Sequence, residues 1–576
     1  MSNKKDSKLQ RKGFISELKR RRVLPVAGAY LVAAWVLIQV TDVIVPAFAF
    51  PNYIITAVLI VAILGFPVAI ALAWAFDITT DGIKRTLEDW HEVPENSRPD
   101  SPASSHNFVA SVPPGSVVVL PFLNIGGKAE NEYFSDGLTE DIIDALAKIP
   151  NLQVVARTSS FVFKNQNKDI RDIGSHLNVE YVVEGSVRKA DDQMRIVAQL
   201  IGVKDGYHVW SETFDRKLVD VFDTLDDITQ AIALHIIELL NKTHDVVEET
   251  QHHLITRHTS NLDAYHLYLK GRYFWNQRGD GIRKGMEYFQ QAAAADSRYA
   301  LPYVGLADTY ALLGYYGSMP PKLAFPLADE NATRALSLNP SLAEAHTSKA
   351  LVKMYFGWDW QGADEEFLKA IALDSKYPQA HYWLSVLHTI QQDPIKAVEQ
   401  DRIALEVDPV SPFVIMHHGW TLHCAGRYKE AIKQFRKALE LDHKLWSAYN
   451  LLVHSYSQIG SYNDALAAGE ILIKGTGNSA MVLPSIGYAH AKAGEADKAR
   501  AVIAELESRD GEFFWPSQVA CIYGELEEFD LAFEWLEKAY LIRDHWLITM
   551  NVQPGYRALH ADPRYSEFAS RVGIGN

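Results

Sequence analysis

Cysteine is scarce in this sequence of 576 residues, which contains only Cys424 and Cys521. Two distant cysteines cannot form the disulfide framework of a small secreted domain, and their scarcity agrees with a reducing compartment. His417, His418 and His423 lie near Cys424, but no CxxC or HxxxH spacing accompanies them. We therefore interpret this region as a packed helix and expect no bound metal.

Recognisable catalytic motifs are also missing. No GxSxG, HExxH or SxxK arrangement with partners is present, and Gly126–Lys128 lacks the GxxxxGK[ST] spacing of a phosphate-binding loop. Arg157–Ser160 could bind an anion, although a turn is the simpler explanation. A predicted helix has an acidic start, where the helix dipole favours carboxylates without any function. These carboxylates are Asp136, Glu140, Asp141 and Asp144. We predict a chain that is not an enzyme and binds no cofactor.

Acidic residues outnumber basic ones beyond the first 22 residues. The chain has 56 Lys and Arg against 71 Asp and Glu, which gives a net charge of −15. Residues 1–22 contain nine basic residues against Asp6 and Glu17, hence +7, which leaves −22 for the remainder. An acidic body lacks the basic surface that nucleic-acid binding requires. We therefore expect no nucleic-acid partner.

Two long runs with almost no charge follow the basic segment. Val23 to Val45 has Asp42 as its one charged residue, and Tyr53 to Phe76 has none. Each run can cross a hydrocarbon core about 30 Å thick, so residues 23–76 are predicted to form a transmembrane helical hairpin. Basic residues precede and follow the hairpin and none lies in its turn. By the positive-inside rule, both termini are then cytoplasmic.

Two alternatives concern this region. Ala47-Phe48-Ala49 imitates the cleavage site of a signal peptide, but the first apolar run is too long for such a peptide and a second run follows it. Asp42 could be a functional intramembrane carboxylate, yet its position beside the turn favours the far membrane interface.

A proline- and serine-rich stretch from His91 to Gly115 predicts a linker at the end of a juxtamembrane segment, residues 77–115. Strand-like and helix-like runs follow over residues 116–242 in the order β-α-β-α-β-β-β-α. Turn signals separate the last three strands, between Tyr181 and Phe214, so these strands are expected to form a meander. The pattern predicts a small α+β domain.

Small residues recur at a fixed interval along the second half of the chain. They are Gly285, Ala328, Ala363, Ala397, Ala431, Ala465, Ala499 and Ala532. Five of the seven intervals are 33 or 34 residues, the period of stacked helix–turn–helix repeats. The pattern resembles the tetratricopeptide repeat family over about residues 261–544, with about eight repeats and a C-terminal cap at 545–576. The second repeat departs from it through an insertion at Gly317–Pro321, and the sixth through Gly469 and a glycine-containing end at 474–477.

Stacked repeats form a superhelix with a concave groove, so the resemblance implies a surface for a protein or peptide partner. The first helices of repeats four to seven direct seven side chains toward this groove. These candidate groove residues are Tyr382, Met416, Trp420, His423, Asn450, His454 and Tyr488. An exposed groove of this composition suits an apolar or mixed peptide. Several of the seven could equally be ordinary core residues.

A second resemblance rests on five separated blocks. They are Val118–Phe122, Asn131–Glu140, Ala156–Phe161, Tyr181–Arg188 and Gly206–Arg216. Over about residues 115–240 these blocks resemble the bacterial TolB-like (FlgO-like) N-terminal domain, whose members are often fused to tetratricopeptide repeats. Some members carry a DNA-binding, kinase or nucleotide-cyclase domain in front, where this chain has the predicted hairpin. The resemblance implies a bacterial inner-membrane protein and brings no catalytic residues with it.

We thus expect a mixed fold: a transmembrane hairpin, a small α+β domain and an all-α repeat superhelix. The predicted function is a non-enzymatic scaffold or sensory adaptor, anchored in the bacterial inner (plasma) membrane through residues 23–76 and able to self-associate. One alternative is an envelope assembly or transport component whose soluble part is periplasmic. Another is an enzyme or small-ligand binder built on the α+β domain.

Overall fold

The computed structural model describes residues 41, 76–79, 82–85, 112–126, 131–149, 152–166, 168–190, 192–239 and 258–575. The chain divides into two compact units, Met1–Phe108 and Val109–Asn576. In the first unit, strand β1 (Phe76–Thr79) pairs antiparallel with β2 (Gly82–Arg85). This hairpin was not expected in the juxtamembrane segment.

The predicted membrane hairpin lies almost wholly outside the described residues, and its topology stays a prediction. The described residues also exclude the basic segment 1–22, Asp42, most of the linker and Gly127-Lys128. β1 begins at Phe76, the last residue assigned to the second span, which shortens that span by one residue. Among the helices that the structure describes, none is long and apolar enough to cross a membrane.

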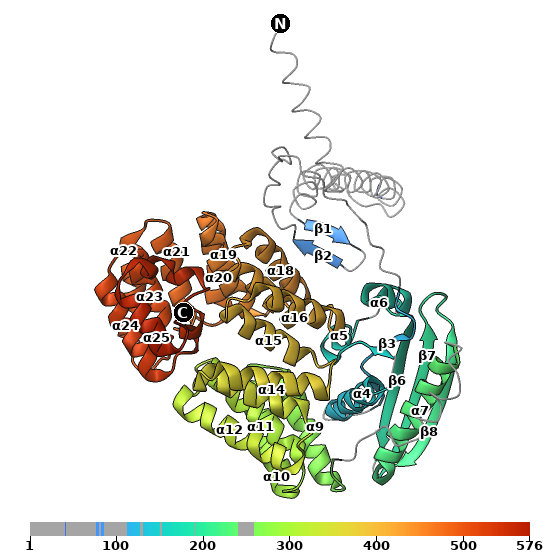
Figure 1. The fold of residues 1–576 in the computed structure, drawn as a ribbon. Coiled ribbons are helices and arrows are strands. Elements are labelled where there is room, and N and C mark those ends of the chain that lie inside the picture. The colour runs from blue at the N-terminus through green and yellow to red at the C-terminus, as the bar shows by residue number, and fades with distance from the viewer. Residues whose placement is uncertain are drawn as a thin grey trace. The chain divides into compact units, whose positions relative to one another are not determined.

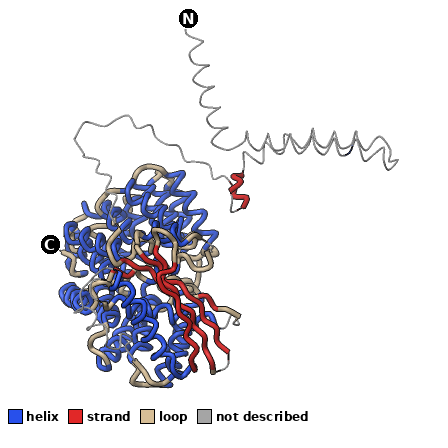
Figure 2. Tube along the Cα trace, turned by 90° about the vertical axis from the view of Figure 1, so that its right-hand side faces the viewer, coloured by secondary structure: helices blue, strands red, loops and turns tan. Residues whose placement is uncertain are grey.

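The second unit begins with a six-stranded mixed sheet (Figure 1). Its strands are β3 (Ser116–Val119), β4 (Leu123–Asn124), β5 (Gln153–Val154), β6 (Tyr181–Ala190), β7 (Gln193–Gly202) and β8 (His208–Lys217). The order is β5-β3-β6-β7-β8, and β4 pairs with β6. β3 is parallel to β5 and β6, whereas β6, β7 and β8 form the antiparallel meander that the turn signals predicted (Figure 2).

Helices cover both faces of this sheet. They are α4 (Glu132–Ala147), α5 (Arg157–Phe161), α6 (Ile170–Leu177) and α7 (Val221–Leu239), with the short 3₁₀ turn η2 (Leu218–Asp220) before α7. Alternate residues of β7, such as Ile196 and Leu200, pack in one core with Leu138 of α4 and Ile232 of α7. On the opposite face, Val182 of β6 packs in a second core with residues of α6. Because successive side chains of a strand point to opposite faces, the sheet contributes residues to two cores.

Eight antiparallel helix pairs follow (Figure 1). The pairs are α9 (Leu262–Asn276) with α10 (Asp280–Ala295), α11 (Ala300–Tyr315) with α12 (Pro321–Leu338), α13 (Ala343–Val352) with α14 (Trp360–Leu373), α15 (Pro378–Ile390) with α16 (Pro394–Val407), α17 (Pro412–Cys424) with α18 (Tyr428–Leu441), α19 (Trp446–Gln458) with α20 (Tyr462–Gly475), α21 (Leu483–Lys492) with α22 (Ala496–Ser508), and α23 (Pro516–Glu525) with α24 (Phe529–Ile542). A π-helical turn, η3 (Lys353–Gly357), extends α13. The C-terminal segment contains η4 (His545–Thr549), η5 (Pro554–Ala561) and α25 (Arg564–Val572).

The periodic small residues lie where the two helices of each pair touch. All seven alanines of the series are completely buried. At Gly285, an added Cβ would lie 2.8 Å from the carbonyl oxygen of Gly271 on the other helix of the pair. The helices therefore approach too closely for larger side chains, which is the reason for the 34-residue pattern. The prediction of tetratricopeptide repeats is confirmed.

The irregular sixth repeat keeps the same architecture by a different distribution of volume. A Cβ on Gly469 would overlap the side chain of Ile486 on α21, and one on Gly475 would overlap the ring of Trp446 on α19. Large side chains of neighbouring helices therefore fill the space that these glycines leave. The departure from the family pattern is compensated within the local packing.

Candidate functional site on the concave face of the repeats

All seven candidate groove residues lie on first helices of the repeats, as expected: Tyr382 on α15, Met416, Trp420 and His423 on α17, Asn450 and His454 on α19, and Tyr488 on α21. Their exposure differs from the prediction. Met416, Trp420, His423, His454 and Tyr488 are between 1% and 8% exposed, while Tyr382 and Asn450 are partly buried. An open aromatic groove is therefore the wrong description of five positions, and partner binding at the seven stays a prediction.

These side chains contact one another from repeat to repeat. Tyr382 stacks on His417 with ring centroids 4.6 Å apart, and His454 lies 5.0 Å from the ring of Tyr488. Nδ1 of His423 lies 2.8 Å from Oγ of Ser455. Burial lowers the pKa of His423 to about 3 and that of His454 to about 4. Both imidazoles are therefore neutral members of a packed interior.

The C-terminal segment contributes to this burial at Tyr488, because it packs against α21 and α23. Leu547, Met550 and Leu559 of this segment are completely buried in the same core as the groove residues. A Cβ on Gly555 would lie 3.2 Å from Sγ of Cys521 and 3.7 Å from Cε2 of Tyr488. The C-terminal segment thus occupies the part of the concave face beside α21 and α23.

The same segment joins the two ends of the array. The His545 ring lies 4.4 Å from that of Tyr315 on α11 and 4.6 Å from that of Trp515 before α23. Nε1 of Trp360 donates a hydrogen bond of 2.7 Å to the carbonyl oxygen of Gly573. The guanidinium of Arg543 lies 3.8 Å from the centre of the Trp358 ring. The final repeats therefore close against the second and third repeats.

The sheet domain docks on the first repeat through the acidic side of α4. The Tyr265 hydroxyl of α9 donates a hydrogen bond to Asp141, and Nη2 of Arg272 lies 3.3 Å from Oε2 of Glu140. Burial raises the pKa of Asp141 to about 7, against the opposing effect of the Tyr265 hydrogen bond. Burial also acts to raise the pKa of Glu140, but Arg157 and Arg272 outweigh it and lower that pKa. These carboxylates bind the repeats, a role beyond the helix-dipole explanation.

A second docking contact centres on Asp408, at the end of α16. Its Oδ1 accepts hydrogen bonds from the backbone N–H of Ser159 at 3.0 Å and from Oγ of Ser159 at 2.6 Å, and its Oδ2 accepts one from the Thr158 hydroxyl. Val410 N–H in turn donates to Oγ of Ser159 at 3.0 Å. The segment Arg157–Ser160, for which the sequence favours a turn, is the start of a short helix. This helix binds the carboxylate of Asp408 from the same chain.

A third contact comes from Lys376, in the loop before α15. Its Nζ donates hydrogen bonds of 2.5 Å to the carbonyl oxygen of Leu152 and 3.4 Å to that of Ala147. The ammonium group thus satisfies carbonyls at the end of α4 and before β5. Sequence reasoning missed both Lys376 and Asp408. The only available signal was the pairing of hydroxyl residues at Thr158 and Ser159.

A shallow cavity of about 540 Å³ opens at the junction of the sheet domain and the first repeat. Lys164 is one of its lining residues, and its ammonium bonds the carboxylates of Glu132 at 2.8 Å and Asp136 at 2.6 Å. Arg157 lies 3.9 Å above the Phe161 ring and is paired with Glu140. These charges are already neutralised within the protein, so the cavity does not point to a charged ligand.

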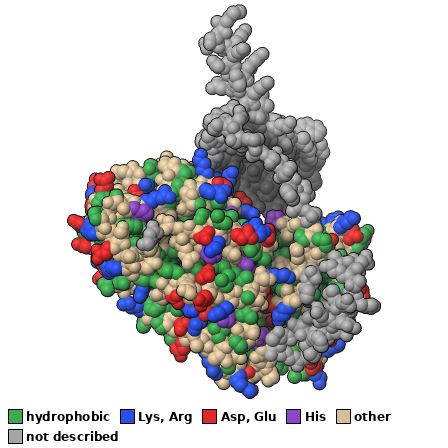
Figure 3. Space-filling model, in the orientation of Figure 1, with side chains coloured by type: hydrophobic (Ala, Val, Ile, Leu, Met, Phe, Trp, Pro, Cys, Tyr) green, Lys and Arg blue, Asp and Glu red, His purple; other side chains and the backbone are tan. Residues whose placement is uncertain are grey.

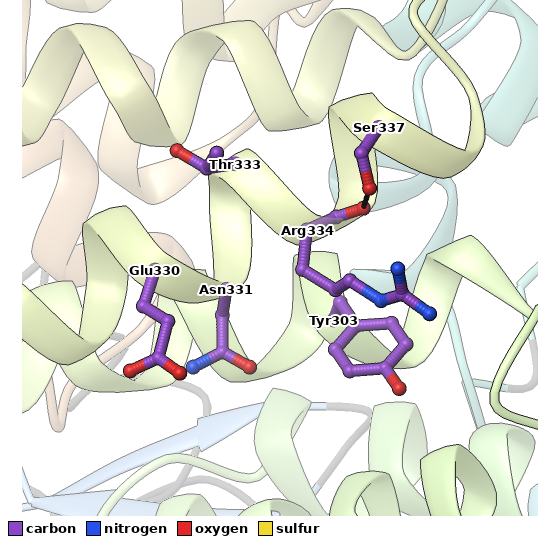
Figure 4. A pocket seen from close by; sticks show the side chains of 6 residues that line it. All are labelled: Tyr303, Glu330, Asn331, Thr333, Arg334 and Ser337. Carbon is purple, nitrogen blue, oxygen red and sulfur yellow. Dashed lines mark hydrogen bonds between the residues drawn. The ribbon is translucent and has the colours of Figure 1, made fainter.

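A second cavity, of about 470 Å³, lies between α11 and α12 (Figure 4). The guanidinium of Arg334 is 5.7 Å from the centre of the Tyr303 ring, and Oγ of Ser337 donates to the carbonyl oxygen of Arg334 at 2.7 Å. Asn331 bonds the carbonyl oxygen of Leu327 on its own helix. These polar groups are engaged locally. In the described part of the chain, no cluster of three or more His, Cys, Asp or Glu side chains could hold a metal ion.

Acidic and basic side chains are interspersed over the surface that Figure 3 displays. Charge of one sign does not dominate this face of the described residues, although the chain as a whole is acidic. The distribution offers no large basic field of the kind that attracts a phosphate backbone. Nucleic-acid binding therefore finds no support on this face.

Comparisons with known proteins match both parts of the second unit. Residues 115–232 match the family model of the HilA/YgeH-like transcriptional regulator, second domain, and residues 415–444 match the tetratricopeptide repeat. A putative adenylate cyclase 3 from Rhizobium meliloti is 30% identical over 318 residues, which are 53% of this chain and 45% of that protein. Transcriptional regulator HilA from Salmonella typhimurium is 22% identical over 349 residues, 58% of this chain and 53% of that protein.

The chain spans about half the length of the curated relatives it matches. Among solved structures, a tetratricopeptide repeat protein from Parabacteroides merdae is 16% identical, covers 47% of this chain and 99% of its own, and has a TM-score of 0.32. The region matched by the HilA/YgeH-like model coincides with the sheet domain, including β3 to most of α7. The chain therefore combines tetratricopeptide repeats with a sheet domain similar to the second domain of HilA/YgeH-like regulators.

Proposed function

We propose that this protein is a non-enzymatic scaffold or sensory adaptor in which the sheet domain and the repeats act as one regulatory body. The observation that carries the proposal is the docking of the sheet domain at three places: on the first repeat at Tyr265, and before and after the fourth repeat at Lys376 and Asp408. Tetratricopeptide repeats are protein-binding elements. A ligand or partner that shifts the sheet domain would therefore shift the surface of the repeats with it.

The names of the two relatives support a regulatory role over an envelope transport role. One is named as an adenylate cyclase and the other as a transcriptional regulator. Their shared feature with this chain is a matched region of about half of each protein. We infer that this region is a sensory or adaptor module. The TolB-like resemblance of the five sequence blocks remains part of the proposal, as does the absence of catalysis.

The proposed location is the bacterial inner membrane, with both termini in the cytoplasm. It is supported by the two uncharged runs within residues 23–76 and by the basic segment before them. A reporter that is active only in the periplasm and one that fluoresces only in the cytoplasm, each fused after Asn576, test this topology. Cytoplasmic fluorescence alone supports the two-span anchor. Periplasmic activity alone would move the proposal to the envelope alternative.

The partner surface is tested by crosslinking in the same host. Of the two groove positions that are only partly buried, Asn450 is the better one, because Tyr382 stacks on His417. A photoreactive amino acid at Asn450 is expected to capture a defined cytoplasmic protein, whereas one at Glu430, exposed on α18, is not. Equal capture at both positions would remove the concave face from the proposal.

A further inference from the structure

Strand β8 forms one edge of the sheet. It pairs with β7 on one side, and among the described residues no strand lies on its other side. Eight of its ten residues are exposed. Alternate residues of an antiparallel strand direct their N–H and C=O groups to opposite sides, so about half of β8 presents these groups on the free side. The long strands of the sheet are visible in Figure 2, and β8 is labelled in Figure 1.

Natural proteins protect such edges with proline, bulges, very short strands or charged side chains. β8 contains no proline, and its ladder with β7 is irregular only between Leu200 and Ile201, near the start of β8. From Ser211 to Lys217 the register with β7 is continuous. This stretch is therefore regular and long enough to accept another strand.

The sequence of β8 is complementary to itself. Glu212 and Arg216 lie at equal distances on either side of Phe214, and so do Thr213 and Asp215. Within the chain Asp215 pairs with Arg195 at 2.6 Å and Arg216 lies 3.7 Å from Asp227, in ion pairs that are exposed to solvent. If a second copy pairs antiparallel so that the two Phe214 residues are opposite, each Glu212 faces an Arg216 and each Thr213 faces an Asp215. Opposite charges and hydrogen-bonding pairs directly across an antiparallel ladder are stabilising. The symmetry doubles each pair.

We propose that two copies of this chain associate through β8, antiparallel and centred on Phe214, so that their two six-stranded sheets become continuous. The occupant is a second copy because the charge pattern matches itself about this residue. The interface lies on the sheet domain and not on the repeats. The inference does not depend on the membrane anchor or on the adaptor role.

Charge exchange in the purified full chain, in detergent, tests this interface. Glu212→Arg and Arg216→Glu each place like charges opposite at two symmetric sites, whereas the double variant restores opposite charges. Sedimentation velocity over a concentration series should give a dimer whose Kd rises about tenfold or more in each single variant and returns in the double variant. Glu430→Arg, in an exposed ion pair on α18, is the matched control and should leave the Kd unchanged.

Crosslinking of two variants, each with one new cysteine, tests the interface independently of the charge exchanges. Cys424 and Cys521 are buried, so a new surface cysteine dominates the reaction with a short bismaleimide. Thr213→Cys should crosslink two copies, whereas Glu184→Cys on the central strand β6 should not. A chain that is monomeric at its highest soluble concentration would overturn the proposal in favour of a foreign strand at this edge. Single charge variants that match the wild type, or equal crosslinking at positions 213 and 184, would overturn it as well.

Discussion

Asp408 illustrates how a single carboxylate acquires a role that its neighbours in the repeat series lack. Asp408 and Asp442 both cap the C-terminal end of a second helix, one repeat apart. Asp442 accepts a hydrogen bond from the local N–H of Lys444, at 2.9 Å. Asp408 is buried and instead accepts three hydrogen bonds from Thr158 and Ser159 of the sheet domain.

Removing this carboxylate should therefore weaken the docking of the two domains. Asp408→Ala leaves a buried N–H and two hydroxyls without an acceptor, and hydrogen bonds to charged groups contribute about 1.5–3 kcal/mol. We expect the free energy of unfolding to fall by about 2–3 kcal/mol, measured by urea denaturation. Asp442→Ala, the control in the next repeat, should cost less than about 1 kcal/mol. Equal losses would mean that Asp408 acts only as a helix cap.

His545 should make the stability of the protein sensitive to acid. Burial lowers its pKa to about 3, and neither ring nitrogen has a hydrogen-bond partner within the described structure. Since the pKa in the unfolded chain is near 6.5, its stabilising effect is complete above that pH and is lost as the pH falls toward 3.

The free energy of unfolding of the variant His545→Phe, relative to that of the wild type, should therefore increase by about 1 kcal/mol for each pH unit below 6.5. Denaturation of both proteins at pH 7, 6 and 5 measures the difference between their free energies of unfolding. Because both proteins contain the other buried histidines, the effects of those residues cancel in this difference. His443→Phe changes an exposed histidine and should show no such trend. A constant offset at all pH values would contradict the assignment.

At the scale of elements, the contact between α4 and α9 has the opposite pH dependence. The pKa of Asp141 is raised to about 7, chiefly by burial. A carboxyl with a raised pKa in the folded state supports stability below its unfolded pKa, near 4, and this support is lost as the pH rises through about 7. Asp141→Asn keeps an acceptor for Tyr265 but cannot ionise.

This variant should become more stable than the wild type as the pH rises from 4 to 7, by about 1–3 kcal/mol, with no further change above pH 8. Urea denaturation across this range gives the comparison. Asp497→Asn, a fully exposed carboxylate on α22, is the control. A wild-type advantage at pH 8 would mean that the charge of Asp141 stabilises the contact.

The sequence predicted those elements whose causes are local. The 34-residue period identified the helix pairs because each small residue marks a contact between adjacent helices, and turn signals between Tyr181 and Phe214 identified the meander. Placing Met416 and Tyr488 on first helices followed from the same period. The burial of Tyr488 could not be predicted, because Gly555 of the C-terminal segment lies against it. The Asp408 contact was also hidden, since Asp408 has the same repeat position as Asp442.

At the scale of the whole molecule, the C-terminal segment should be an integral part of the array. Removal of residues 545–576 would expose the apolar residues that Leu547, Met550 and Leu559 cover. We expect a severalfold increase in the fluorescence of a hydrophobic dye and a lower midpoint of thermal unfolding. Trp360→Phe removes only one hydrogen bond to this segment and should have a small effect. An unchanged midpoint after truncation would show that the segment is dispensable.

The contacts of Trp360 and His545 with distant repeats have a mechanical consequence. An open array of helix pairs behaves as a spring, because each repeat touches only its neighbours and small rotations add along its length. Here the C-terminal residues contact the second and third repeats, so stretching the array must first break these aromatic and hydrogen-bonded contacts. The array is therefore stiff at low force and yields first at this fastening, which makes it suited to transmit displacement from the sheet domain as a rigid lever.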